Sequence, residues 1–200
     1  MNLLVAFPQW DTDLFLLLNG LHADWLDPIM FFISGNFSWV PLYILIAILF
    51  YRKYGGAKTL FLIAGIALCV LFADRISAGF FKPVFERLRP SREPAIEGLV
   101  HTINEYKGGL FGFVSSHAAN NFAIIVFTLL VIRNRYYTIG MLFLACFISY
   151  SRIYLGVHYP LDIICGALLG IAIGVGVYHL HQLALRKWVE RKERKQKVTG

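Results

Sequence analysis

Five apolar runs, several of which approach the length of a membrane span, constrain this chain more than any other feature of its sequence. The bilayer core is crossed by about 20 apolar residues in a helix. The runs lie at about Trp39–Tyr51, Ala57–Phe81, Ser116–Ile132, Tyr136–Tyr150 and Pro160–Leu183. A hydrophobic content of 58% and a mean hydropathy of +0.61 exclude an ordinary soluble domain. The sequence therefore predicts an all-α, polytopic membrane helical bundle of about five to six spans, forming a single domain over residues 1–200.

The two ends of the chain differ from these runs. Residues 1–25 mix apolar and polar positions, which predicts an N-terminal interfacial helix with Trp10 and Trp25 at headgroup level. Early acidic residues and the lack of a basic leader segment argue against a signal peptide. Residues 186–200 form a basic tail, which we expect on the cytoplasmic side.

The distribution of basic residues predicts the orientation. Twelve of the 19 Lys and Arg residues lie in two turns and the tail, each separated from the next by two predicted spans. The positive-inside rule places that face in the cytoplasm, so residues 82–115 and 151–159 share the opposite face. The net charge of +7 is thus explained by topology, and we expect no nucleic-acid partner.

The stretch Ser151–Asp162 joins two predicted spans and carries Arg152, His158 and Asp162. Asp162 follows His158 by four residues, and Pro160 suits the first turn of the next helix. On that geometry the carboxylate reaches the imidazole and fixes its tautomer, which leaves the other ring nitrogen free to attack. Arg152 offers a planar fork of donors suited to phosphate. The alternative is a polar loop with an ordinary helix cap.

Two further pieces are predicted on the same face. Lys82 and Arg89 are seven residues apart, so a helix would place them on one side, although Pro83 disfavours a regular helix there. Arg87 is another cation of this connection, and either anion binding or a solvated loop explains these charges. The Ser-Ser-His sequence at 115–117 begins the third run, where a serine cap and a helix N-terminus favour phosphate. Two histidines, one aspartate and three fixed cations suit phosphoryl transfer through a covalent histidine without a metal.

These pieces resemble the three signature motifs of the phosphatidic acid phosphatase type 2 superfamily, which are Lys-x6-Arg-Pro, Pro-Ser-Gly-His and Ser-Arg-x5-His-x3-Asp. The matching residues are Lys82, Arg89 and Pro90 for the first motif, Ser115 and His117 for the second, and Ser151, Arg152, His158 and Asp162 for the third. The second motif departs from the family pattern, because Val114 and Ser116 replace its proline and glycine.

The resemblance implies a metal-independent membrane phosphatase that forms a phosphohistidine intermediate. It implies His158 as the nucleophile, Asp162 as the residue that orients it, and His117 as the general acid. The substrate-binding residues that it implies are Lys82, Arg89, Ser115, Ser116 and Arg152.

The expected substrate is a lipid phosphate or pyrophosphate in the bilayer, with no cofactor. Undecaprenyl pyrophosphate, phosphatidylglycerol phosphate, phosphatidic acid and lipid A all remain candidates. The expected location is the bacterial inner membrane, with the site on the extracytoplasmic face. The alternative is a lipid-phosphate binding or transport protein without hydrolysis, against which the pairing of His158 with Asp162 argues.

Overall fold

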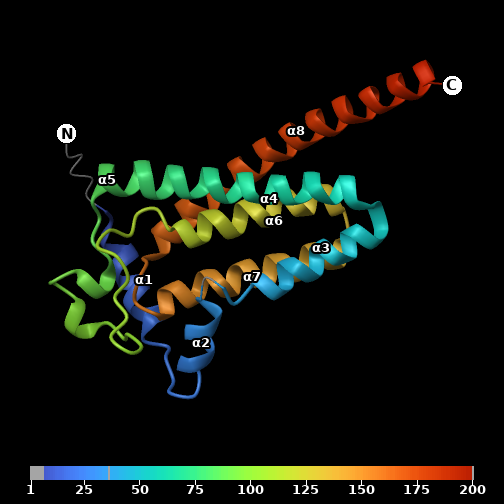
Figure 1. The fold of residues 1–200 in the computed structure, drawn as a ribbon. Helices are drawn as coiled ribbons and strands as arrows, with labels where there is room; N and C mark the ends of the chain where they lie inside the picture. The colour runs from blue at the N-terminus through green and yellow to red at the C-terminus, as the bar shows by residue number, and fades with distance from the viewer. Residues whose placement is uncertain (1–6, 36, 200) are drawn as a thin grey trace.

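The computed structural model describes residues 7–35 and 37–199, which form a bundle of helices (Figure 1). The α-helices are α1 (Gln9–Asn19), α2 (Asp27–Ile33), α3 (Val40–Tyr54), α4 (Gly56–Ile76), α5 (Lys82–Phe85), α6 (Ser116–Ile132), α7 (Arg135–Tyr154) and α8 (Pro160–Thr199). A π-helical segment, Ser77–Phe81, joins α4 to α5. Within the described residues there is no β-strand, and the predicted all-α class is confirmed.

In the part of the chain that the structure describes, three helices are long and apolar enough to cross a membrane, namely Gly56–Phe85, Arg135–Tyr154 and Pro160–Lys197. Helix α6 is shorter and apolar, and it has the bounds that its apolar run predicted. Helix α8 is longer than expected, because it continues through most of the predicted tail as far as Thr199. The count of five to six spans stays a prediction.

The core of the bundle lies where α6 packs against α8 and α4. Gly166, Gly170 and Gly174 line the face of α8 that meets α6. A Cβ atom at any of the three would overlap a backbone carbonyl oxygen of α6 or of its N-cap residue, Ser115. The glycines therefore let the two backbones approach closely, as small residues do between membrane helices.

The two connections that carry the motifs lie at one end of the bundle. Figure 1 shows the long connection between α5 and α6 at the same end as the turn between α7 and α8. The turns α3–α4 and α6–α7 lie at the opposite end, towards which the end of α8 extends. The predicted proximity of the three motifs is therefore present in the fold.

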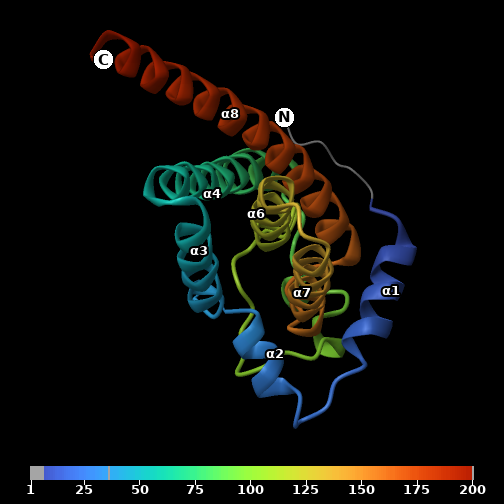
Figure 2. The same ribbon diagram turned by 90° about the vertical axis from the view of Figure 1, so that its right-hand side faces the viewer.

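Helix α1 packs against α7 and α8 at the motif end of the bundle (Figure 2). It is shorter than the predicted helix over residues 1–25, of which residues 1–6 lie outside the described residues. Asp11, Phe15 and Asn19 recur at helical spacing and are buried, whereas Trp10 and Leu17 are exposed on other faces. The Asn19 amide nitrogen donates to three backbone carbonyls that anchor the end of α1. Its interfacial position stays a prediction.

Lys82 and Arg89 do not share one helical side, which corrects an expectation from their spacing. Helix α5 ends at Phe85, and Glu86 then adopts a left-handed conformation with φ 45°. The chain continues in extended form and pairs with residues 110–112, since the Gly112 N–H donates to the Arg87 carbonyl at 2.8 Å. This pairing, and not a helix, positions Arg89.

Candidate active site

His158 and Asp162 form the centre of the site. His158 lies in the turn before α8, and Asp162 lies in the first turn of that helix, which begins at Pro160 as predicted. The His158 Nδ1 atom is 3.3 Å from Asp162 Oδ2, and the side chains are 1% and 0% exposed. The same carboxylate oxygen accepts from the Tyr159 N–H at 3.1 Å. The contact at Nδ1 leaves Nε2 as the ring nitrogen available for attack.

The surroundings of His158 keep its imidazole neutral. Burial lowers its pKa well below the usual value, and the charges of Arg89, Arg152 and Lys82 lower it further. Burial together with the charge of Arg152 also lowers the pKa of Arg89, to about 10, so that this guanidinium stays protonated at neutral pH. The site therefore combines a neutral, buried histidine with fixed positive charge.

The two arginines of the site are held by the backbone and by a serine. Arg89 donates from Nε to the Phe111 carbonyl at 3.2 Å. Arg152 is 2% exposed and donates to the side chain and carbonyl of Ser34. Its buried Nε has no hydrogen-bond partner among the described residues. A buried donor without a partner is costly, so a phosphate oxygen that accepts from it would relieve that cost.

The second motif contributes the N-terminus of α6. Ser115 is the N-cap, and its hydroxyl accepts from the Ala118 N–H at 3.4 Å. The Ser115 N–H donates to the Asp162 carbonyl at 3.0 Å, which ties the start of α6 to the start of α8. Ser116 stands where the family pattern has glycine, and its hydroxyl accepts a hydrogen bond from Ser77 at 2.9 Å. This hydrogen bond holds the Ser116 side chain against the π-helical segment.

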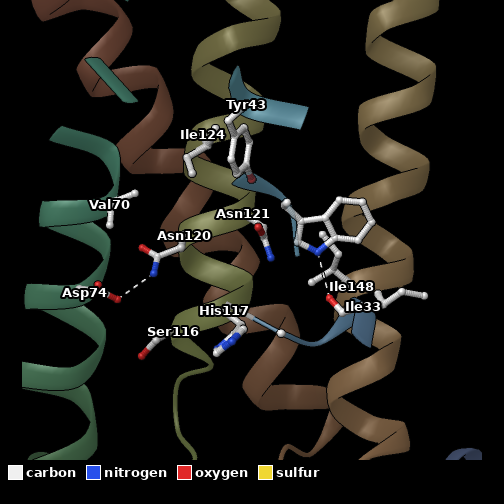
Figure 3. Close-up of a pocket in the computed structure, with 12 residues that line it drawn as sticks. Ile33, Tyr43, Val70, Asp74, Ser116, His117, Asn120, Asn121, Ile124 and Ile148 are labelled. Carbon is white, nitrogen blue, oxygen red and sulfur yellow. Dashed lines mark hydrogen bonds between the residues drawn. The ribbon is translucent and has the colours of Figure 1, made fainter. Parts of the chain in front are cut away.

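His117 faces a pocket of about 380 Å³ between α3, α4, α6 and α7 (Figure 3). Asp74 and Asn120 form one polar side of this pocket, where the Asn120 amide donates to the Asp74 carboxylate at 2.7 Å. Trp39 and Tyr43 contribute to the less polar lining. A pocket with both polar and apolar walls beside His117 suits an amphiphilic leaving group.

Three residues around the pair of His158 and Asp162 were not predicted as site residues, and one of them, Asp11, reaches Asp162 only through Arg87. Arg87 donates to the carboxylates of Asp162 and Asp11. The sequence had predicted either anion binding or a solvated loop for this cation, and neither names these two partners. Asp11 was assigned to the polar positions of the N-terminal helix. Gly112 lies so close that a Cβ atom would be 2.9 Å from Asp162 Oδ2. The spacing of Asp11 and Arg87, 76 residues, leaves no local pattern that could reveal the pair.

An oriented histidine beside fixed cations, at one end of an apolar helical bundle, defines a membrane enzyme for phosphoryl transfer. Residues 58–186 match the PAP2 superfamily, and the chain belongs to that superfamily. The predicted family is thereby confirmed, and with it the class of enzyme, a phosphatase.

Curated relatives and a solved structure agree with this assignment. The chain is 36% identical to a lipid A 4'-phosphatase of Porphyromonas gingivalis, over 90% of this chain and 76% of the relative. It is 38% identical to a lipid A 4'-phosphatase of Bacteroides thetaiotaomicron, over 88% of this chain and 79% of the relative. An undecaprenyl-diphosphatase of Sulfolobus acidocaldarius is 32% identical over 80% of this chain and 73% of its own length. The crystal structure of Aquifex aeolicus LpxE superposes with a TM-score of 0.64 at 26% identity, covering 88% of this chain and 98% of that one.

Proposed function

We propose that this protein is a lipid phosphatase that removes a phosphate monoester from a lipid A-type glycolipid. Two relatives at 36% and 38% identity carry the name lipid A 4'-phosphatase, which favours this substrate over the other lipids. The partly polar pocket beside His117 supports the proposal, because an acylated sugar has polar groups next to apolar chains. Residues 1–200 would act as one membrane domain.

The observation that carries the proposal is the contact between His158 and Asp162 within a cluster of cations. The lone pair of His158 Nε2 attacks phosphorus while the bond from phosphorus to the leaving oxygen breaks. His117 gives its proton to that oxygen, so the sugar departs as a neutral alcohol. Lys82, Arg89 and Arg152 stabilise the charge on the phosphoryl oxygens.

The second half of the reaction regenerates the enzyme. The neutral His117 accepts a proton from water, whose oxygen attacks the phosphorus of phosphohistidine 158. The bond between phosphorus and nitrogen breaks, inorganic phosphate forms, and His158 is neutral again. The N-terminus of α6, with Ser115 and Ser116, adds donors near the phosphate. Asp162 holds the ring throughout, and no step requires a metal.

The proposed location is the inner membrane, with the site on the extracytoplasmic face. The basic residues of the α3–α4 and α6–α7 turns and of the end of α8 support this orientation, because positive charge favours the cytoplasmic side. The site then lies near the lipid headgroups of the outer leaflet, where a lipid phosphate is reached without leaving the bilayer.

A pyrophosphate lipid is the second candidate substrate, since one relative at 32% identity is named an undecaprenyl-diphosphatase. Its leaving group is a phosphate, which needs less protonation than a sugar hydroxyl. Binding or transport without hydrolysis is the other alternative. It gives no reason for a buried histidine whose tautomer is fixed by a carboxylate.

The test is phosphate release by the purified protein from detergent micelles. The panel comprises lipid A, undecaprenyl pyrophosphate, phosphatidylglycerol phosphate and phosphatidic acid, each with and without EDTA, and His158→Ala is the control. We expect the highest kcat/KM on lipid A, no effect of EDTA, and no release by the variant. A higher kcat/KM on another lipid would reject the substrate, and binding without release from any lipid would reject hydrolysis.

A further inference from the structure

Arg87 joins the catalytic aspartate to the N-terminal helix. Its two terminal nitrogens donate to different carboxylates, Asp162 Oδ1 at 2.8 Å and Asp11 Oδ2 at 2.6 Å. The Arg87 side chain is 7% exposed, and both carboxylates are fully buried. Charge-assisted hydrogen bonds of this length, removed from water, are among the strong ones. The orientation of Asp162 thus depends on a residue that lies far from it in sequence.

Aromatic rings fix the plane of the Arg87 guanidinium. Its central carbon lies 3.9 Å from the centre of the Phe7 ring and 3.8 Å from the centre of the Tyr159 ring. A flat guanidinium stacks on such rings, whereas an ammonium cannot reproduce both the stacking and the fork. Arg87 is therefore restricted in position and in direction.

Asp11 completes the arrangement from the other side. Its Oδ1 atom accepts from the Leu161 N–H at 2.8 Å, in the first turn of α8, while Oδ2 binds Arg87. Burial raises the pKa of Asp11, and the hydrogen bonds from Arg87 and Leu161 oppose that effect. Helix α1 thus contacts the start of α8 both directly and through Arg87.

We propose that Arg87 and Asp11 are positioning residues for the reaction, which hold Asp162 ionised and aimed at Nδ1 of His158. Neither residue touches the substrate. This inference rests on the phosphatase activity proposed above, and that activity is measured separately in the unaltered protein.

The proposal predicts a specific change in pH dependence. A buried carboxylate that loses its cation takes up a proton more readily, and a protonated Asp162 no longer holds the imidazole in the reactive tautomer. The charged and titratable groups that face Asp162 from the surrounding elements are His158, Tyr159, Arg87, Arg89, Lys82, Asp11 and Cys165. Among these groups, Arg87 is the cation that donates directly to the carboxylate.

The test measures kcat and KM against pH for Arg87→Gln and for the double variant Arg87→Gln with Asp11→Asn. The double variant removes the cation without leaving a charged Asp11 buried and unpaired, so it guards against a loss of folding. We expect kcat to fall roughly 10- to 100-fold in both variants, by analogy with the hydrogen-bond partners that orient metal-ligating residues. We expect the acid limb of kcat/KM to move upward by about one pH unit or more.

The matched controls carry the same substitutions at exposed positions. Asp13→Asn lies on α1, where Asp13 accepts from the Gln9 side chain, and Arg92→Gln lies on the connection that carries Arg87. Both controls should keep the kcat and the pH profile of the unaltered protein. A folded Arg87→Gln or double variant with unchanged kcat would overturn the proposal. So would a lower kcat with an unmoved acid limb, which is the result of a merely structural role.

Discussion

Nδ1 of His158 lies 3.3 Å from Oδ2 of Asp162, and neither side chain is more than 1% exposed. Burial removes the water that would otherwise compete for both groups, so the carboxylate can set the tautomer of the ring. The same burial, with Arg89, Arg152 and Lys82 nearby, lowers the pKa of His158. In the proposed mechanism this contact aims the nucleophile, and the surroundings of the ring keep it unprotonated.

The lowered pKa of His158 predicts the acid limb of the pH–rate profile. Attack needs the neutral ring and an ionised Asp162, so the rate falls when a drop in pH protonates either group. Because the pKa of His158 is lowered, the limb of kcat/KM should lie below the ordinary histidine value of about 6.5. Arg89→Gln removes one of the charges that lower this pKa, so its limb should move upward. The pH profiles of the unaltered protein and of Arg89→Gln are measured with the same substrate, so ionisation of the substrate affects both equally and does not contribute to the difference between them. A limb that stays in place or moves downward in Arg89→Gln would contradict this assignment.

Arg152→Lys should lower kcat/KM by about 10-fold or more, which corresponds to ~1.4 kcal/mol. Arg152 is bound to Ser34 on one side and has a buried Nε without a partner among the described residues, so the fork has a free donor for phosphate. Lysine keeps the charge but cannot bind Ser34 and two phosphate oxygens in this geometry. Steady-state kinetics on a lipid phosphate measure the effect, and near-normal turnover would mean that only the charge of Arg152 matters.

Gly112→Ala should inactivate the enzyme far more than Gly98→Ala. A Cβ atom at position 112 would lie 2.9 Å from Asp162 Oδ2, 3.4 Å from Arg89 Cγ and 3.6 Å from His158 Nδ1. At Gly98, in the same connection, a Cβ atom meets nothing within 4 Å. Even a small displacement of reacting groups is costly, so we expect roughly a 100-fold loss for Gly112→Ala and nearly none for Gly98→Ala. Equal activities in folded variants would show that Gly112 does not limit the placement of the pair.

The orientation is tested by labelling cysteines in intact cells with a reagent that does not cross membranes. The three native cysteines, Cys69, Cys146 and Cys165, are first replaced by serine. Gly98→Cys at the motif end should react, whereas Arg52→Cys at the opposite end should react only after the membrane is opened. The reverse pattern would place the site on the cytoplasmic face.

Local patterns allowed several parts of this site to be predicted. The four-residue spacing of His158 and Asp162, with Pro160 between them at the start of α8, predicts a contact between the turn before the helix and its first turn. The bounds of α6 followed from an apolar run that a serine N-cap precedes. Such features depend on neighbours in sequence, so the sequence alone is sufficient to locate them.

Other parts depend on contacts between distant segments. The contact of Arg87 with Asp11 spans 76 residues. The mixed polar and apolar sequence of residues 1–25 predicts an interfacial helix, but it does not predict that a buried face of α1 supports α8. The placement of Arg89 depends on an extended pairing with residues 110–112, whereas its spacing from Lys82 suggested a helix. Tertiary contacts of this kind override local preference, and residue spacing does not reveal them.

Trapping the covalent intermediate tests the central claim most directly. His117→Ala is mixed with a phosphate ester of an acidic leaving group such as a nitrophenol, quenched, and mapped by mass spectrometry, with His158→Ala in parallel. A good leaving group needs little protonation, so His117→Ala should still form the adduct. The account predicts an acid-labile phosphohistidine at position 158 in His117→Ala and no adduct in His158→Ala. An adduct at His117, or one that persists in His158→Ala, would show that the nucleophile has been wrongly assigned.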